Sequence, residues 1–268
     1  MTVPSSPPPR TATGSRVVPG APNARDLAGL RADSGLRVRP GLMYRGAGAA
    51  VGPLAGRAGL RAVLDLRDGR ERAGGEPPPD VTVLSRPLVA DRSAIKGGGP
   101  PQPSHYLAYY RQLARPAAPI AAELVGLLAG PAARLPLLVC CSAGKDRTSV
   151  VCALALRAVG VRTADLARDH ALTGRLFRRD PDAARLLPWA RGLAPYELAA
   201  RTATPGHVLR ELLSGLEREH GSVRRFLTDH GLRPETVRRA RHVLLGDPRT
   251  AVDGRGLFHR PRSDSDRS

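Results

Sequence analysis

Short apolar runs, separated by turns rich in glycine and proline, are the first feature of the chain. Four of these runs predict strands, at residues 36–45, 61–66, 81–88 and 135–140. The last run, Leu-Pro-Leu-Leu-Val-Cys, is the most apolar of the four. We therefore expect it to lie in the centre of a sheet.

Longer segments carry apolar residues at helical spacing. They predict helices over 104–129, 148–159, 205–221, 222–230 and 233–245, and one more that starts within 162–170. Pro116 and Pro119 are expected to break the first of these helices, because proline has no amide hydrogen to donate. Strands that alternate with helices predict an α/β fold, with helices on the faces of the sheet.

The pattern also predicts one domain between two tails. Residues 1–20 are rich in proline, serine and threonine and are expected to be disordered, and 247–268 form a polar, flexible C-terminal tail. A single domain then covers residues 21–246. Within it, 92–104 predict a flexible loop. The irregular segment 171–204 is either a mobile helical lid over the functional site or a peripheral helical insert.

Composition excludes several classes of protein. The chain has 268 residues, 41% of them apolar and 3% aromatic, so a core of Leu, Val and Ala is expected. Three cysteines are too few for a disulfide scaffold, and no apolar run reaches the ~20 residues of a membrane span. The N-terminus lacks the apolar stretch of a signal peptide. We expect a cytoplasmic protein with reduced thiols and no stable membrane insertion; export without a signal peptide is the alternative.

The formal net charge of +18 points to an anionic partner. Nucleic acid is not the expected one, because the arginines are spread along the chain without the interleaved aromatic residues of single-strand binders. The scarcity of Lys, Asn and Ile is typical of a GC-rich genome and explains the arginine content without a function. Rare residue types are informative where they remain, and Lys145 and Asn23 both lie in motifs described below.

One motif carries the candidate chemistry. The strand at 135–140 runs directly into Cys-Ser-Ala-Gly-Lys-Asp-Arg-Thr, residues 141–148, where a helix begins. A helix N-terminus presents unpaired backbone N–H groups and binds anions, and a loop of successive N–H groups can wrap a phosphate. The planar guanidinium of Arg147 can hold two phosphate oxygens, and the same positive surroundings favour the thiolate of Cys141 as a nucleophile. Only Cys141 fits this spacing, because six residues beyond Cys140 the chain has Asp146.

The loop resembles that of the atypical bacterial tyrosine/serine protein phosphatases, a dual-specificity family. Three further stretches are similar to family motifs: Asn-Ala-Arg-Asp-Leu-Ala-Gly followed by Val-Arg-Pro-Gly-Leu-Met-Tyr-Arg-Gly, then Val-Leu-Asp-Leu-Arg-Asp-Gly-Arg-Glu-Arg, then a Gly-Ser-Val segment near the C-terminus. The resemblance spans roughly residues 20–246. It implies a cysteine-dependent phosphatase fold: a central, mostly parallel sheet flanked by helices, with a helical C-terminal part.

The resemblance also implies an activity. It implies a protein tyrosine phosphatase that hydrolyses phosphomonoesters through a phosphocysteine intermediate, with no metal and no cofactor. Phosphorylated proteins are the implied partners, and phosphoserine, phosphothreonine and phosphoinositides are further candidate substrates.

The same resemblance assigns the site residues by position. Cys141 is the nucleophile and Arg147 the phosphate clamp. Thr148 would hydrogen-bond the cysteine sulfur, and Lys145 would contact the substrate phosphate or a second anionic group. The substrate-binding residues are Ser142, Ala143, Gly144, Lys145 and Thr148.

The general acid has three candidates. Asp146 lies in the loop and is the residue that the family resemblance implies. Its neighbours Lys145 and Arg147 favour its ionised form, so an ion pair that orients Arg147 is its other possible role. Asp91 follows the second strand, and Asp68 follows the Asp-Leu-Arg strand.

Departures from the family pattern leave a second function open. Cys140 stands where the family usually has His, and Ser149 where it usually has Gly. The alternative is therefore a catalytically impaired phosphate-binding module of the same fold. Asn23, Arg25 and Asp26 either brace the loop or form a capped turn.

Three other residues have open roles. Cys140 and Cys152 are either core residues or partners in a reversible disulfide with Cys141. His170 is expected to be a structural hydrogen-bonding residue. The histidines show no metal-ligand spacing.

Overall fold

The computed structural model describes residues 16–72, 78–89, 91, 95, 102–131, 134–180, 187 and 190–247. Residues 1–15 and 248–268 of the expected tails, and most of the expected 92–104 loop, lie outside the described residues. Ordered structure starts before residue 21, where the domain was expected to begin, because Arg16–Val17 form a strand that pairs with Arg25–Asp26.

A six-stranded sheet forms the centre of the fold, in the order β1-β2-β4-β7-β5-β6. Strands β4, β7, β5 and β6 are parallel, and the short β1 and β2 add to one side in antiparallel orientation. The sheet is thus mostly parallel, as the sequence indicated. Its strands are β1 (Arg16–Val17), β2 (Arg25–Asp26), β4 (Met43–Ala47), β5 (Ala62–Asp65), β6 (Thr82–Ser85) and β7 (Leu137–Cys141).

Strand β7 lies between β4 and β5, so the most apolar run of the sequence is central, as predicted. All five of its residues are buried. Side chains alternate along a strand, and here Leu137, Val139 and Cys141 pack into the larger hydrophobic cluster while Leu138 and Cys140 pack into a smaller one. The two faces of the sheet are therefore both covered.

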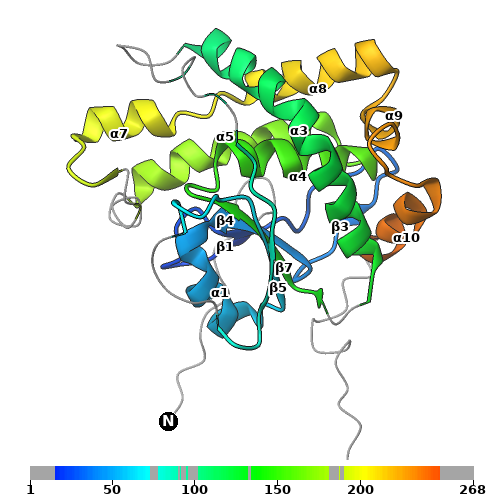
Figure 1. Ribbon diagram of the computed structural model, residues 1–268, viewed down its shortest axis with the longest axis horizontal. Coiled ribbons are helices and arrows are strands. Elements are labelled where there is room, and N and C mark those ends of the chain that lie inside the picture. The colour runs from blue at the N-terminus through cyan, green and yellow to red at the C-terminus, as the bar shows by residue number, and fades with distance from the viewer. Residues whose placement is uncertain are drawn as a thin grey trace, which may run out of the picture.

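Helices cover these two faces unequally. Helix α1 (Val51–Ala58) packs in the smaller cluster with Leu138 and Cys140, and α3 (Pro103–Ala129) and α4 (Asp146–Ala158) pack in the larger one. Figure 1 shows α1 on one side of the sheet and the longer helices on the other. The remaining helices of the described residues are α5 (Thr163–Arg179), α7 (Pro195–Thr202), α8 (Gly206–His220), α9 (Val223–Thr228) and α10 (Pro234–Leu244), with the turn η1 (Gly48–Ala50) before α1.

Helix α3 corrects one prediction. It runs unbroken through Pro116 and Pro119, which were expected to interrupt it. A proline inside a helix costs about 3 kcal/mol. Most of α3 is buried, including Tyr110, Leu113 and Leu124, and this burial offsets the lost hydrogen bonds.

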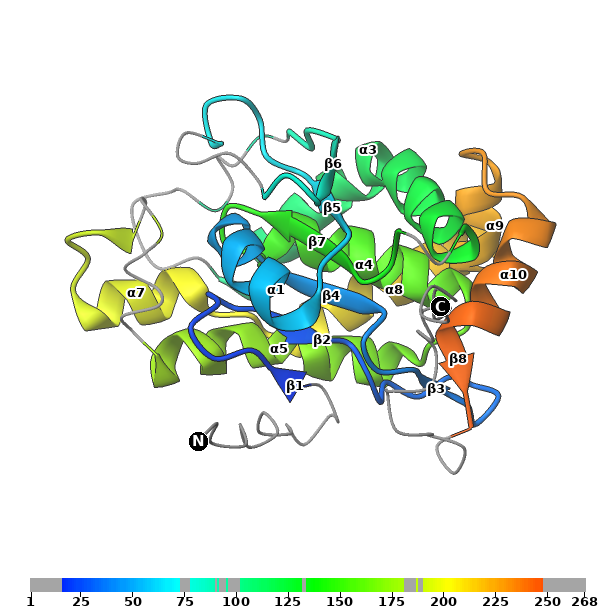
Figure 2. The same ribbon diagram turned by 90° about the horizontal axis from the view of Figure 1, so that it is seen from below.

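The C-terminal helices close one end of the molecule. Helices α8, α9 and α10 fall within two residues of the three predicted segments. A second, two-stranded sheet of β3 (Arg37–Val38) and β8 (Leu245–Gly246) ties the early chain to the end of α10. Figure 2 shows α10 and α7 at opposite ends of the molecule. Among the described helices, none is both long and apolar enough to cross a membrane.

Candidate active site

The candidate phosphate loop lies between the central strand and helix α4. Cys141 is the last residue of β7 and is buried, and α4 begins at Asp146. The side chain of Lys145, the N-cap residue of α4, makes no capping hydrogen bond. Gly144 has a φ of +63°, and a Cβ atom there would lie 2.2 Å from the carbonyl carbon and oxygen of Gly46. Only glycine fits this approach of the loop to the end of β4.

Side chains from two distant segments hold the carbonyl groups of the loop. The Asn23 amide donates to the carbonyl oxygens of Ala143 at 2.8 Å and Gly144 at 3.0 Å. The Arg45 Nη2 donates to the carbonyl oxygens of Gly144 at 2.9 Å and Lys145 at 3.1 Å. In a planar trans peptide, C=O and N–H point in opposite directions, so the following N–H groups point to the other side of the loop. This orientation suits a loop that donates hydrogen bonds to a phosphate.

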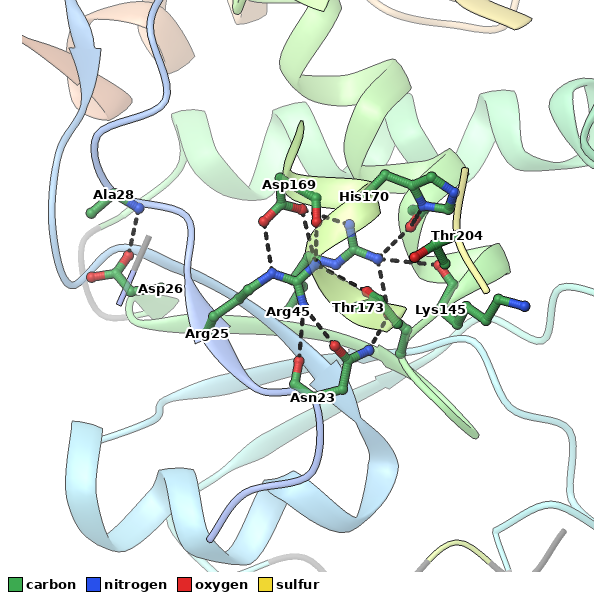
Figure 3. Close-up of polar contacts among 12 residues, drawn as sticks. Asn23, Arg25, Asp26, Ala28, Arg45, Lys145, Asp169, His170, Thr173 and Thr204 are labelled. Carbon is green, nitrogen blue, oxygen red and sulfur yellow. Dashed lines mark hydrogen bonds and ion pairs between the residues drawn. The ribbon is translucent and has the colours of Figure 1, made fainter. Parts of the chain in front are cut away.

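A buried ion cluster supports these two side chains (Figure 3). Asp169 on α5 accepts from Arg25 Nε at 2.7 Å and from Arg45 Nη1 at 2.8 Å. Arg25 also donates to the Asn23 side chain at 2.7 Å and to the Thr173 hydroxyl at 3.2 Å. Burial alone would raise the pKa of Asp169, but the two guanidinium groups hold it below its ordinary value. Asn23 and Arg25 therefore brace the loop.

Asp26 has the other of its two expected roles. Its carboxylate accepts from the backbone N–H of Ala28 at 3.0 Å and of Gly41 at 2.8 Å. Asp26 thus caps turns next to the brace.

Arg147 meets a carboxylate that we did not expect at this site. Its Nη1 and Nη2 each lie 2.6 Å from an oxygen of Glu71, which follows β5. The Ser142 hydroxyl also donates to Glu71, and Arg147 Nη1 donates to the carbonyl of Leu66 at 3.2 Å. Glu71 therefore links the two ends of the phosphate loop.

The charge of Arg147 also sets the ionisation of Glu71. Partial burial would raise the pKa of Glu71, but hydrogen bonds from Arg147 and Ser142 lower it to about 2. Asp68, one of the candidate acids, accepts from the backbone N–H of Glu71 at 2.9 Å and so shapes this turn. Asp91, the other rival, is exposed.

Asp146 and Lys145 lie side by side under helix α3. The Tyr110 hydroxyl donates to Asp146 Oδ1 at 2.7 Å, and Lys145 Nζ lies 3.6 Å from the same oxygen. Lys145 Nζ donates to the Tyr106 hydroxyl at 3.0 Å and to the carbonyl of Arg201 in α7 at 2.8 Å. The buried ammonium thus ties the loop to α3 and α7.

Thr148, the residue that follows Arg147, lacks the contact expected of it. The Thr148 hydroxyl is buried without a hydrogen-bond partner in the described chain, so the expected bond to the Cys141 sulfur is not formed.

The other two cysteines lie in surroundings that keep them protonated. Burial raises the pKa of Cys140 well above its ordinary value and that of Cys152 to about 12. All three cysteines are free and buried. Cys140 lies on the opposite face of the sheet from Cys141, whereas Cys152 shares the larger cluster with it.

Part of the segment 171–204 packs directly on the loop. Helix α5 continues through Arg179, and α7 covers Pro195–Thr202. A small hydrophobic cluster joins these elements to the loop, with Ala47, Ala143, Phe177, Leu187, Ala190, Leu193 and Leu198. The segment therefore lies next to the candidate site; residues 181–186, 188 and 189 are outside the described chain.

Sequence reasoning missed several of the contacts around the loop. Glu71 stands in a motif that was recognised, but nothing local showed that its carboxylate reaches Arg147. Tyr110 lies in a helix whose apolar spacing predicted only packing. Asp169 and His170 are polar residues in an amphipathic helix, and their complete burial is what marks them.

Among the described residues, no group of three or more His, Cys, Asp or Glu side chains is placed to hold a metal ion. The groups available for an anionic substrate are the loop amides, Arg147 and the helix N-terminus.

Comparison with known proteins agrees with this geometry and with the motif resemblance. A model of the tyrosine phosphatase family matches residues 17–246. The triple specificity protein phosphatase PtpB of Mycobacterium tuberculosis is 31% identical over 290 aligned positions, which cover 86% of this chain and 99% of that protein. Matches over so much of the chain show that it belongs to the tyrosine phosphatase family and is a cysteine-dependent protein phosphatase.

Proposed function

We propose that this phosphatase removes phosphate from tyrosine in proteins through a phosphocysteine intermediate on Cys141. Phosphoserine, phosphothreonine and phosphoinositide headgroups are the further substrates of the proposal. The loop carries it: Cys141 ends the central strand, α4 starts at Asp146 directly after the loop, and Asn23 and Arg45 hold the intervening carbonyl groups. Similarity to the mycobacterial relative, a triple specificity phosphatase, supports the wider substrate range.

The proposed reaction has two steps. The Cys141 thiolate attacks phosphorus, and the bond from phosphorus to the leaving oxygen breaks while Asp146 gives that oxygen a proton. Water then attacks the phosphocysteine, Asp146 accepts its proton, and the sulfur–phosphorus bond breaks. Arg147 and the loop amides of residues 142–147 bind the phosphoryl oxygens in both steps.

The structure offers support for Asp146 as the acid over its two rivals. Asp146 stands in the first turn of α4, next to Arg147, and its side chain is 11% exposed. Asp68 is engaged in the turn before Glu71, and Asp91 is exposed. We place these residues in one phosphatase domain of residues 21–246, to which the short β1 adds from Arg16.

Turnover of a phosphotyrosine peptide and of 4-nitrophenyl phosphate, in reductant and chelator, tests the proposal. We expect phosphate release that survives the chelator, is abolished in Cys141→Ser, and falls by about 10²-fold or more in Arg147→Lys, which keeps the charge but loses the planar fork. Acid quench of Asp146→Asn during turnover should trap labelled phosphate on Cys141. Phosphopeptide binding without release by the folded wild type would instead favour a phosphate-binding module.

A further inference from the structure

A chain of buried polar side chains runs from the loop brace to the proposed acid. Arg45 Nη2 donates to the Ser149 hydroxyl, which lies 2.8 Å from His170 Nδ1. His170 Nε2 lies 3.2 Å from the Tyr110 hydroxyl, and that hydroxyl lies 2.7 Å from Asp146 Oδ1. Ser149, His170 and Tyr110 are fully buried. Their polar atoms are therefore paired with one another in a place that bulk water does not reach.

The protonation of the middle residue follows from its surroundings. Burial, reinforced by the charge of Arg45, lowers the pKa of His170 to about 3, so the imidazole is neutral. A neutral imidazole has one N–H donor and one acceptor nitrogen. Burial and the neighbouring Asp146 raise the pKa of Tyr110 well above its ordinary value, so its hydroxyl keeps its proton.

These protonation states give the series of hydrogen bonds a direction. Tyr110 donates its single hydrogen to Asp146 Oδ1, so its oxygen can only accept from His170, and the imidazole proton is on Nε2. Nδ1 of the neutral imidazole is then an acceptor and takes the Ser149 hydrogen. The Ser149 oxygen accepts from Arg45 Nη2. Every donor has an acceptor, and the chain ends on one named oxygen.

We infer that Ser149, His170 and Tyr110 form a positioning relay, which holds Oδ1 of Asp146 as an acceptor so that the transferred proton is carried by Oδ2. A carboxylic acid accepts through its carbonyl oxygen and donates through its hydroxyl, so Tyr110 suits both the acid and the carboxylate form. In both steps the proton therefore leaves from, and returns to, the same oxygen. This inference rests on the proposed role of Asp146.

The relay also gives Ser149 a function. The family pattern has Gly at this position, and a glycine cannot join Arg45 to His170. Without the hydrogen bond from Ser149, the imidazole is free to take the other tautomer, in which Nε2 accepts from Tyr110. The Tyr110 hydrogen would then be withdrawn from Asp146.

Dependence on the leaving group separates positioning of the acid from a structural role. Aryl phosphates with poor leaving groups need a proton in the transition state, and 4-nitrophenyl phosphate needs it much less. We expect Tyr110→Phe to lower kcat/KM for phenyl phosphate about tenfold more than for 4-nitrophenyl phosphate, since a positioned acid contributes about 10²–10⁴-fold. Ser149→Ala should show a weaker effect of the same kind. Tyr196→Phe, which removes a phenol hydroxyl from an exposed position on α7, is the matched control.

The possible outcomes separate the relay from the proposed function. A similar loss for both substrates in folded Tyr110→Phe would overturn the relay and leave the proposed function standing. Leaving-group dependence that is unchanged in Asp146→Asn would overturn the role of Asp146 and the relay with it. As an independent readout, ¹⁵N NMR should show His170 as the neutral Nε2–H tautomer in the wild type. An Nδ1–H tautomer or an imidazolium would contradict the inferred direction.

Discussion

Glu71 forms an ion pair with Arg147, the residue proposed to hold the substrate phosphate. Its two oxygens each lie 2.6 Å from a terminal nitrogen of the guanidinium, which is the bidentate geometry that arginine prefers with carboxylates. With its pKa lowered to about 2, Glu71 is ionised throughout the pH range of an ordinary assay. The pair holds the Arg147 side chain in one orientation beside Ser142.

The lowered pKa of Glu71 predicts a pH-dependent contribution to stability. A carboxyl group whose pKa is lower in the folded state stabilises the fold above its unfolded pKa and loses that effect on acidification. The free energy of unfolding of the wild type should therefore exceed that of Glu71→Gln near neutral pH. The difference should shrink as pH falls from about 4.5 toward about 2. Urea unfolding of both proteins across this range measures it, and a difference that stays constant with pH would contradict the prediction.

At the scale of elements, the phosphate loop is held from three sides. The turn before β2 supplies Asn23, β4 supplies Arg45, and α5 supplies Asp169. Two buried arginines around one buried carboxylate are stable only as a set, because each charge alone would be costly to bury. The sheet and α5 are thereby coupled to the conformation of the loop.

Two substitutions of Asn23 can separate the effect of its hydrogen bonds to the loop from the effect of its backbone conformation. Its φ is +53°, a conformation that glycine adopts freely and alanine does not. Asn23→Ala and Asn23→Gly both remove the donors to Ala143 and Gly144, so both should lose kcat/KM, by about tenfold or more. Asn23→Ala should also be less stable than Asn23→Gly by about 1 kcal/mol. Urea unfolding and steady-state kinetics measure the two effects. Full activity in Asn23→Gly would show that the hydrogen bonds from Asn23 to the loop are dispensable.

At the scale of the whole molecule, the segment between α5 and α8 lies against the site. Leu198 of α7 and Phe177 of α5 share a cluster with Ala143 of the loop, and Lys145 bonds to the Arg201 carbonyl. We therefore expect α7 to limit the size of what can approach Cys141, and changes in α7 to alter substrate choice.

Loosening α7 should favour large substrates. Leu198→Ala removes buried apolar contacts and should destabilise the protein by about 2–3 kcal/mol. Amide hydrogen exchange in residues 195–202 should become faster, and kcat/KM for a phosphopeptide should rise relative to that for 4-nitrophenyl phosphate. Tyr196→Ala, at a side chain that is 76% exposed on the same helix, is the control. An unchanged ratio of the two substrates, despite faster exchange, would show that α7 does not limit access.

Prediction from the sequence was most accurate where local pattern decides structure. The three C-terminal helices, the central strand and the start of α4 were placed within about two residues, because apolar spacing and flanking glycine and proline mark them. The unbroken α3 was not predicted, since the burial that compensates for Pro116 and Pro119 comes from other elements. The contact of Lys145 with α7 was not predicted for a similar reason, because its partner there lies 56 residues along the chain.

Sequence alone was enough to identify the fold class and the family. Both depend on residues that are close together or on motifs in a recognisable order. Which distant side chains meet the loop depends instead on tertiary packing. Asn23 lies 120 residues from Ala143, and Tyr110 lies 36 from Asp146. Spacing in sequence does not specify such contacts. They form because the packing of the sheet, α3 and α5 buries these polar groups together, and a buried polar group without a partner is costly.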